Sequence, residues 1–209
     1  MIRLLLSAEA PVMTEAITRF GGLPLIPVDS AFQWPVCSTC GGAMQFLGQI
    51  ALDGKNATPL ILIFMCQNDP GLCDEWDANL GGNRAHIVAI DTGRLATAPE
   101  LGVTVRDTVY GARVEVVDSP DYNDARQLWT EINQVAPGQI LGVLGGYPCW
   151  LQEDETPDCS RCGSKMSFVA QLEEGPDRKT AMNFGGGGCA YVFYCSCEQG
   201  SAKILWQCG

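Results

Sequence analysis

The chain contains eleven cysteines, and eight of them fall into two groups of four that follow the same order. Each group opens with a Cys-x-x-Cys pair followed by glycine, continues through an apolar stretch, and ends with two further cysteines. A Cys-x-x-Cys turn brings two sulfurs close enough for one ion, and four thiolates make a closed, tetrahedral structural zinc site. The predicted zinc ligands are Cys37, Cys40, Cys66 and Cys73 in one site, and Cys159, Cys162, Cys195 and Cys197 in the other.

Other chemistry is open to these cysteines. Cys208 competes with Cys197 for the fourth place in the second site, but Cys197 and Cys73 each lie between an apolar strand and a returning strand. A disulfide framework would require an oxidising compartment, and the number of cysteines is odd. Redox sensing through Cys195 and Cys197 is a further alternative to metal binding.

The sequence repeats itself around the Cys-x-x-Cys pairs. Residues 35–50 match residues 157–172 at an offset of 122, with identity at 8 of 16 positions, and Gly-Gly-Leu-Pro at 21–24 matches Gly-Gly-Tyr-Pro at 145–148. This pattern predicts two homologous halves, residues 1–110 and 111–209, which pack about a pseudo-twofold axis in a single compact domain.

The fold class that we predict is α+β, strand-rich, with one helix in each half. Apolar residues share one helical face over residues 11–20, and again after Ser119-Pro120, where the stripe ends before Pro137. On residues 45–50 we expect Phe46, Gly48 and Ile50 to share one face. The predicted strands are residues 1–7, 45–50, 61–66, 84–91, 101–106, 113–118, 139–144, 168–172, 190–195 and 202–208.

Charge and hydropathy exclude several classes of partner. The net charge is −11, and the 13 lysines and arginines are scattered along the chain, which argues against nucleic acid and anionic membrane surfaces. No apolar run approaches the ~20 residues of a membrane span, and the N-terminal apolar stretch is too short for a signal peptide. We therefore expect a cytoplasmic protein whose acidic surface attracts a basic protein partner.

Catalytic signals are weak in this sequence. His86 is the single histidine, and no nucleophile motif or cofactor fingerprint is present, so we do not expect an enzyme. Gln49 and Gln171 recur at equivalent strand positions. They are either buried amides that satisfy backbone groups or ligand contacts in a cleft between the halves.

Several motifs of this sequence also resemble those of known protein families. The Gly-Gly-Leu-Pro at 21–24, Trp34-Pro35, Phe-Leu-Gly-Gln-Ile at 46–50 and the segment 144–152 resemble the YwqG-like family, a bacterial family of unknown function. This resemblance implies an α+β fold built by internal duplication. The cysteine pairs, with Phe-Met-Cys at 64–66 and Phe-Tyr-Cys at 193–195, look like those of the programmed cell death protein 2 family, which implies escort of a ribosomal protein.

Together these observations lead to two hypotheses of function. The first is a zinc-stabilised cytosolic binding or adaptor protein that escorts or inhibits a basic protein partner. The alternative is an enzyme or small-molecule binder that uses the cleft between the two halves.

Overall fold

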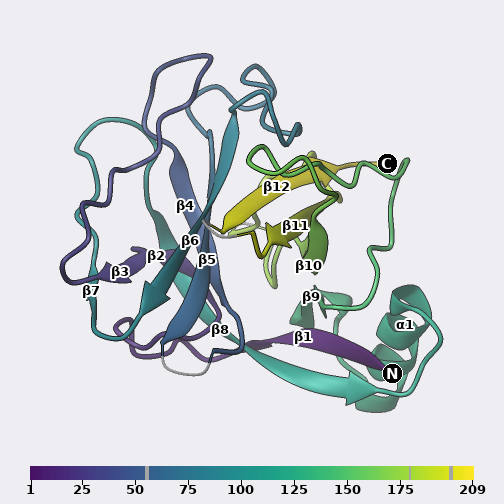
Figure 1. Cartoon of the computed structure of the whole chain (residues 1–209). Helices are drawn as coiled ribbons and strands as arrows, with labels where there is room; N and C mark the ends of the chain where they lie inside the picture. The colour runs from purple at the N-terminus through teal and green to yellow at the C-terminus, as the bar shows by residue number, and fades with distance from the viewer. Residues whose placement is uncertain (55–56, 179, 198–199) are drawn as a thin grey trace.

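The structure is a computed structural model that describes residues 1–54, 57–178, 180–197 and 200–209 (Figure 1). Ten strands form a closed barrel in which all pairings are antiparallel, in the order β1-β8-β2-β4-β5-β6-β12-β11-β10-β9. The barrel strands are β1 (Ile2–Ala8), β2 (Arg19–Gly22), β4 (Gln45–Ala51), β5 (Thr58–Met65), β6 (Asn83–Ile90), β8 (Arg106–Val117), β9 (Ile140–Leu144), β10 (Ser167–Glu173), β11 (Cys189–Cys195) and β12 (Ser201–Gln207).

Three smaller sets of elements lie outside the barrel wall. Strands β3 (Leu25–Pro27) and β7 (Gly93–Leu95) form a two-stranded sheet. Helix α1 (Tyr122–Asn133) follows β8, and a 3₁₀ turn, η1 (Pro137–Gln139), leads into β9. No helix among the described residues combines the length and the apolar character needed to span a bilayer.

The predicted α+β class with two helices is wrong. In the described part of the chain α1 is the only α-helix, and it begins where Asp121 accepts a hydrogen bond from the Asp124 N–H at 3.0 Å. Residues 11–20 form turns and bends instead, and their last two residues belong to β2. They contain the β-branched residues Val12, Thr14, Ile17 and Thr18, which are poor helix formers.

The core lies on both sides of the barrel wall. On β5 the side chains of Ile61, Ile63 and Met65 pack in the cluster of apolar residues that fills the barrel. Leu62 and Phe64 pack in a second cluster, on the outer side of the same strand. Because both faces are covered, β5 is a continuous apolar run rather than an alternating one.

Strands β1 and β8 link the two halves of the chain. Strand β1 pairs with β9 of the second half, β8 pairs with β2 of the first half, and β1 and β8 pair with each other. In Figure 1 these two strands lie side by side at the bottom of the view and extend towards α1. Residue 110, the predicted boundary between the two halves, lies inside β8.

Each half carries a β-bulge at the same place in the repeated sequence. The register shifts between Phe46 and Gly48 in β4, and between Phe168 and Ala170 in β10. Phe46 consequently packs outside the barrel, whereas Ile50 packs inside it. The predicted common face for Phe46, Gly48 and Ile50 is wrong because the bulge adds one residue to the alternation.

Candidate metal centres

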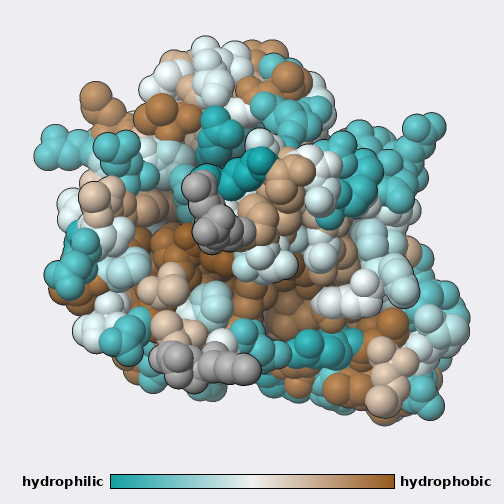
Figure 2. All heavy atoms as spheres, in the orientation of Figure 1, coloured by the Kyte–Doolittle hydropathy of each residue, from teal (hydrophilic) through white to brown (hydrophobic). Residues whose placement is uncertain are grey.

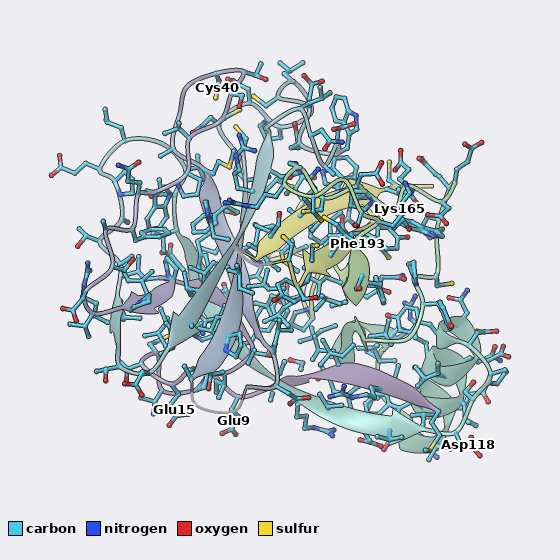
Figure 3. The ribbon with its side chains drawn as sticks, in the orientation of Figure 1. Glu9, Glu15, Cys40, Asp118, Lys165 and Phe193 are labelled. Atoms are coloured by element: carbon cyan, nitrogen blue, oxygen red, sulfur yellow. The ribbon has the colours of Figure 1, made fainter. Side chains whose placement is uncertain are left out.

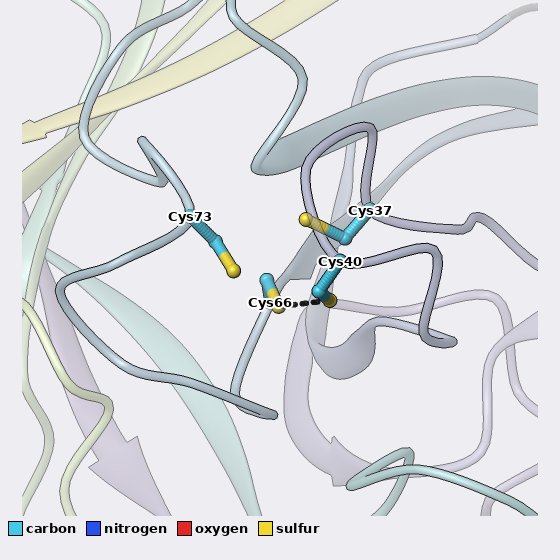
Figure 4. A group of neighbouring side chains, drawn as sticks. All are labelled: Cys37, Cys40, Cys66 and Cys73. Atoms are coloured by element: carbon cyan, nitrogen blue, oxygen red, sulfur yellow. Dashed lines mark hydrogen bonds between the residues drawn. The ribbon is translucent and has the colours of Figure 1, made fainter.

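The first cluster consists of Cys37, Cys40, Cys66 and Cys73, whose sulfurs all lie within 4.8 Å of one another (Figure 4). Cys37 and Cys40 come from the turn that precedes β4, Cys66 follows β5 directly, and Cys73 lies in the loop between β5 and β6. The sulfurs of Cys40 and Cys66 lie 3.7 Å apart. Three of the four side chains are buried, and Cys40 is exposed.

Local backbone bonds shape the turn that carries the first pair. The Cys37 N–H donates to the Gly42 carbonyl at 2.9 Å, and the Gly41 N–H donates to the Cys37 carbonyl at 2.9 Å. Gly41 has φ +70°, a left-handed conformation that glycine adopts without strain. The glycine after the Cys-x-x-Cys pair therefore lets the chain fold back and point both sulfurs the same way.

The second cluster consists of Cys159, Cys162, Cys195 and Cys197, again with all four sulfurs within 4.8 Å of one another. The Cys162 and Cys195 sulfurs are 3.6 Å apart, and those of Cys159 and Cys197 are 3.9 Å apart. Gly163 has φ +73°, so the turn repeats the geometry of the first one. The sulfurs of Cys195 and Cys197 thus each lie close to the sulfur of one cysteine in the turn.

These spacings are typical of four thiolates around one ion. With metal–sulfur bonds of about 2.3 Å, two ligands of a tetrahedral zinc lie about 3.8 Å apart, whereas a disulfide requires about 2.05 Å. All eleven cysteines are free thiols. The structure therefore brings all eight predicted ligands into two groups that can each hold a metal ion, and Cys208 lies outside both.

The electrostatic surroundings differ within the first cluster. The Gly42 backbone N–H donates to the Cys40 sulfur at 3.4 Å and lowers the pKa of this thiol. Burial instead raises the pKa of Cys66 and Cys73. The exposed sulfur thus ionises more readily than the buried ones, which lose their protons when a metal binds.

In the second cluster backbone N–H groups favour the thiolate form of the two cysteines in the turn, Cys159 and Cys162. The Arg161 backbone N–H donates to the Cys159 sulfur at 3.4 Å, and this bond, with the neighbouring Cys162 N–H, lowers the pKa of Cys159 to about 6. A Ser164 backbone N–H likewise lowers the pKa of Cys162. Two sulfurs of this cluster are therefore prepared as anionic ligands.

Two residues that support the first cluster escaped sequence reasoning. The Asn68 amide is 3.5 Å from the Cys66 sulfur and 3.7 Å from the Cys40 sulfur, and it also donates to the Ala43 carbonyl at 3.1 Å. Glu75 is buried, and its carboxylate accepts from the Cys73 N–H at 3.1 Å. The signal for Asn68 was its place two residues after Cys66, which is the place that Cys197 takes after Cys195.

The two glutamines do not face a shared cleft. Gln49 and Gln171 are buried, and their side-chain oxygens accept from the backbone N–H of Leu25 at 3.2 Å and of Cys149 at 2.9 Å. Gln49 also donates to the Ile17 carbonyl at 3.0 Å. They hold the segments that cover the outer faces of the barrel, which is the structural alternative considered for them.

Comparison of this chain with known proteins gives no match. No protein-family model matches this chain, no curated protein matches its sequence, and no solved structure matches its fold.

Proposed function

We propose that this protein is a zinc-stabilised binding protein that holds a basic protein partner. The observation that carries the proposal is the pair of four-sulfur groups, because four thiolates complete the coordination of Zn²⁺ and leave no position for a substrate. Soft thiolate ligands in this number favour Zn²⁺ over harder divalent ions. The metal then organises the scaffold, and function depends on the surface.

The charge of the surface supports a basic partner. The chain carries a net charge of −11, and a field of this sign speeds and orients the approach of a positive surface. The acidic segment, residues 153–158, exposes Glu153, Asp154, Glu155 and Asp158 immediately before the second cluster. This segment is our candidate for the contact with the partner.

Internal hydrogen bonds hold the acidic segment in place. The buried Gln207 amide donates to the Glu153 carbonyl at 2.8 Å and to the Glu155 carboxylate at 2.9 Å. Asp154 accepts from the Thr156 N–H at 2.9 Å. A segment ordered in advance loses less conformational entropy on binding, so its carboxylates serve recognition at a lower cost.

The test is capture of partners from native lysate by the zinc-loaded chain at low ionic strength, quantified by mass spectrometry. Glu153→Gln combined with Asp154→Asn removes two charges and keeps oxygen acceptors. The matched control is Glu9→Gln combined with Glu15→Gln, which removes two charges at the end of the molecule away from Cys40 (Figure 3).

We expect a positively charged protein that the wild type and the control retain and that the first double variant loses. Retention of such a protein by both double variants to the same degree would reject the acidic segment as the contact. Recovery of no basic protein by the wild type would reject the proposed function.

A further inference from the structure

A cavity of about 400 Å³ opens at the seam where the two halves of the barrel meet. Strands β6 and β12 form this seam and share one register pair, Ala85 with Ala202. Small side chains, among them Ala78 and Ser160, line the cavity and leave room beside the strands. Its volume lies in the range of about 300–1,000 Å³ that is usual for small-molecule sites.

Three cations line the seam cavity. Arg84 comes from β6, Lys203 from β12, and Arg161 from the turn of the second cluster, whereas none of its described lining residues is acidic. The chain as a whole has 24 acidic residues and only 13 lysines and arginines. Three cations thus line one cavity of a protein whose overall charge is strongly negative. In Figure 2 hydrophilic side chains gather over the upper part of β6.

Two of these cations face each other across the seam. Arg84 and Lys203 each lie one residue from the Ala85–Ala202 pair, so the antiparallel register places them opposite one another. Like charges at opposite positions on neighbouring strands are destabilising. An anion between them would turn this repulsion into attraction, which is a physical reason for a ligand at this place.

The hydrogen-bonding capacity of the cavity is only partly used. The Lys203 ammonium donates to the Asn79 side-chain oxygen at 2.6 Å and to the Asp158 carbonyl at 2.8 Å, which leaves one of its three donors. The exposed Arg84 guanidinium makes no hydrogen bond or ion pair with the rest of the described chain. Ser160 and Ser201 also line the cavity.

We propose that the seam cavity binds a phosphate group, either as the free ion or on a small molecule. Guanidinium groups match the geometry of phosphate oxygens, and an ammonium adds a charge-assisted bond. The cavity lies next to both cysteine clusters, because Arg161 lies between Cys159 and Cys162, and Asn79 follows Cys73 in the loop between β5 and β6. This inference stands on the cavity itself and does not depend on a protein partner.

The test is isothermal titration calorimetry of the zinc-loaded full chain at low ionic strength. The probes are inorganic phosphate and glucose 6-phosphate, so that the two arms distinguish the free ion from a phosphate on a small carrier. We expect saturable one-to-one binding of at least one probe. Arg84→Gln should weaken it about tenfold, because one charge-assisted contact is lost.

Two further variants keep the test decisive. Lys203→Gln should weaken binding by a similar factor, whereas Arg3→Gln, which removes an exposed cation on β1, should leave it unchanged. Melting temperatures show that each variant is folded. Failure of both probes to saturate, or equal binding by the Arg84→Gln and Arg3→Gln variants, would overturn the proposal.

Discussion

The sulfur of Cys162 lies 3.6 Å from the sulfur of Cys195, although 33 positions separate the two residues in the chain. The contact joins the turn before β10 to the end of β11. Two thiolates at this distance repel each other, so a positive ion between them is the natural stabiliser of the arrangement.

Removal of one ligand should therefore remove one metal ion. Cys162→Ser should lower the zinc content from two ions per chain to one and reduce the melting temperature, since zinc binding in structural sites contributes roughly 10–16 kcal/mol to folding. Elemental analysis with thiol counting measures the content. Cys208→Ser is the matched control, because Cys208 lies outside both clusters and its loss should leave two ions bound. A Cys162→Ser protein with wild-type metal content and melting temperature would contradict the assignment.

Loss of the Asn68 amide should affect one cluster only. Groups that donate to metal ligands typically change metal affinity about 10–100-fold, so Asn68→Ala should release metal faster from the first cluster and leave the second unchanged. Release to a colorimetric chelator should then show one accelerated phase. The control is Asn123→Ala, because the Asn123 amide is 3.2 Å from the sulfur of Cys149, a cysteine outside the clusters. Identical release kinetics for both variants would remove Asn68 from the metal site.

A buried guanidinium should be irreplaceable by lysine. Arg19 is fully buried and donates to the carbonyls of Gly21 at 3.0 Å and Leu23 at 2.6 Å. Burial lowers the pKa of Arg19 to about 10, so the side chain is charged at neutral pH. Lysine has no planar fork to reach both carbonyls, and Arg19→Lys should lower the free energy of unfolding by about 2 kcal/mol.

Urea unfolding of the zinc-loaded chain measures this cost. Arg113→Lys serves as the control, because Arg113 forms an exposed ion pair with Glu115 at 2.9 Å, and such pairs are worth at most about 1 kcal/mol. Equal effects of the two substitutions would show that the fork of Arg19 has no special role.

The single histidine should make stability depend on pH. Burial, with Arg84 nearby, lowers the pKa of His86 below its ordinary 6.5. The unfolded chain therefore binds a proton at a higher pH than the folded chain, and stability should fall as the pH drops below about 6.5. NMR titration of the one imidazole should give a pKa below 6.5. His86→Phe, which keeps an aromatic ring beside Phe64, should reduce the loss of stability between pH 7 and pH 5.5. An imidazole pKa at or above 6.5 would contradict this.

The cysteine groups and most strands could be predicted from the sequence because their signals are local. Cys-x-x-Cys-Gly specifies a turn, and the apolar run that ends in Cys66 or Cys195 specifies a buried strand next to it. The structure accordingly has β5 and β11 where those runs lie. Cys197 rather than Cys208 joins the second cluster, in agreement with its place before the returning strand.

The remaining features depend on partners distant in sequence. Nothing in residues 2–8 indicates that β1 pairs with both β8 and β9, so the closed barrel was not foreseen. The bulge after Phe46 arises from pairing with β5. It shifts the alternation of inward-facing and outward-facing side chains that a regular strand has. No local sequence signal marks Glu75 as buried, yet its carboxylate is buried and accepts from the Cys73 N–H.

The pairing of β1 with β9 and of β8 with β2 makes each half of the chain incomplete by itself. A fragment that ends before β8 would leave one edge of β2 unpaired, and a fragment that begins with β8 would leave β9 open in the same way. Exposed edges of this kind invite aggregation. The two fragments produced together should instead complement one another, and in the intact protein both halves should fold and unfold as one cooperative unit.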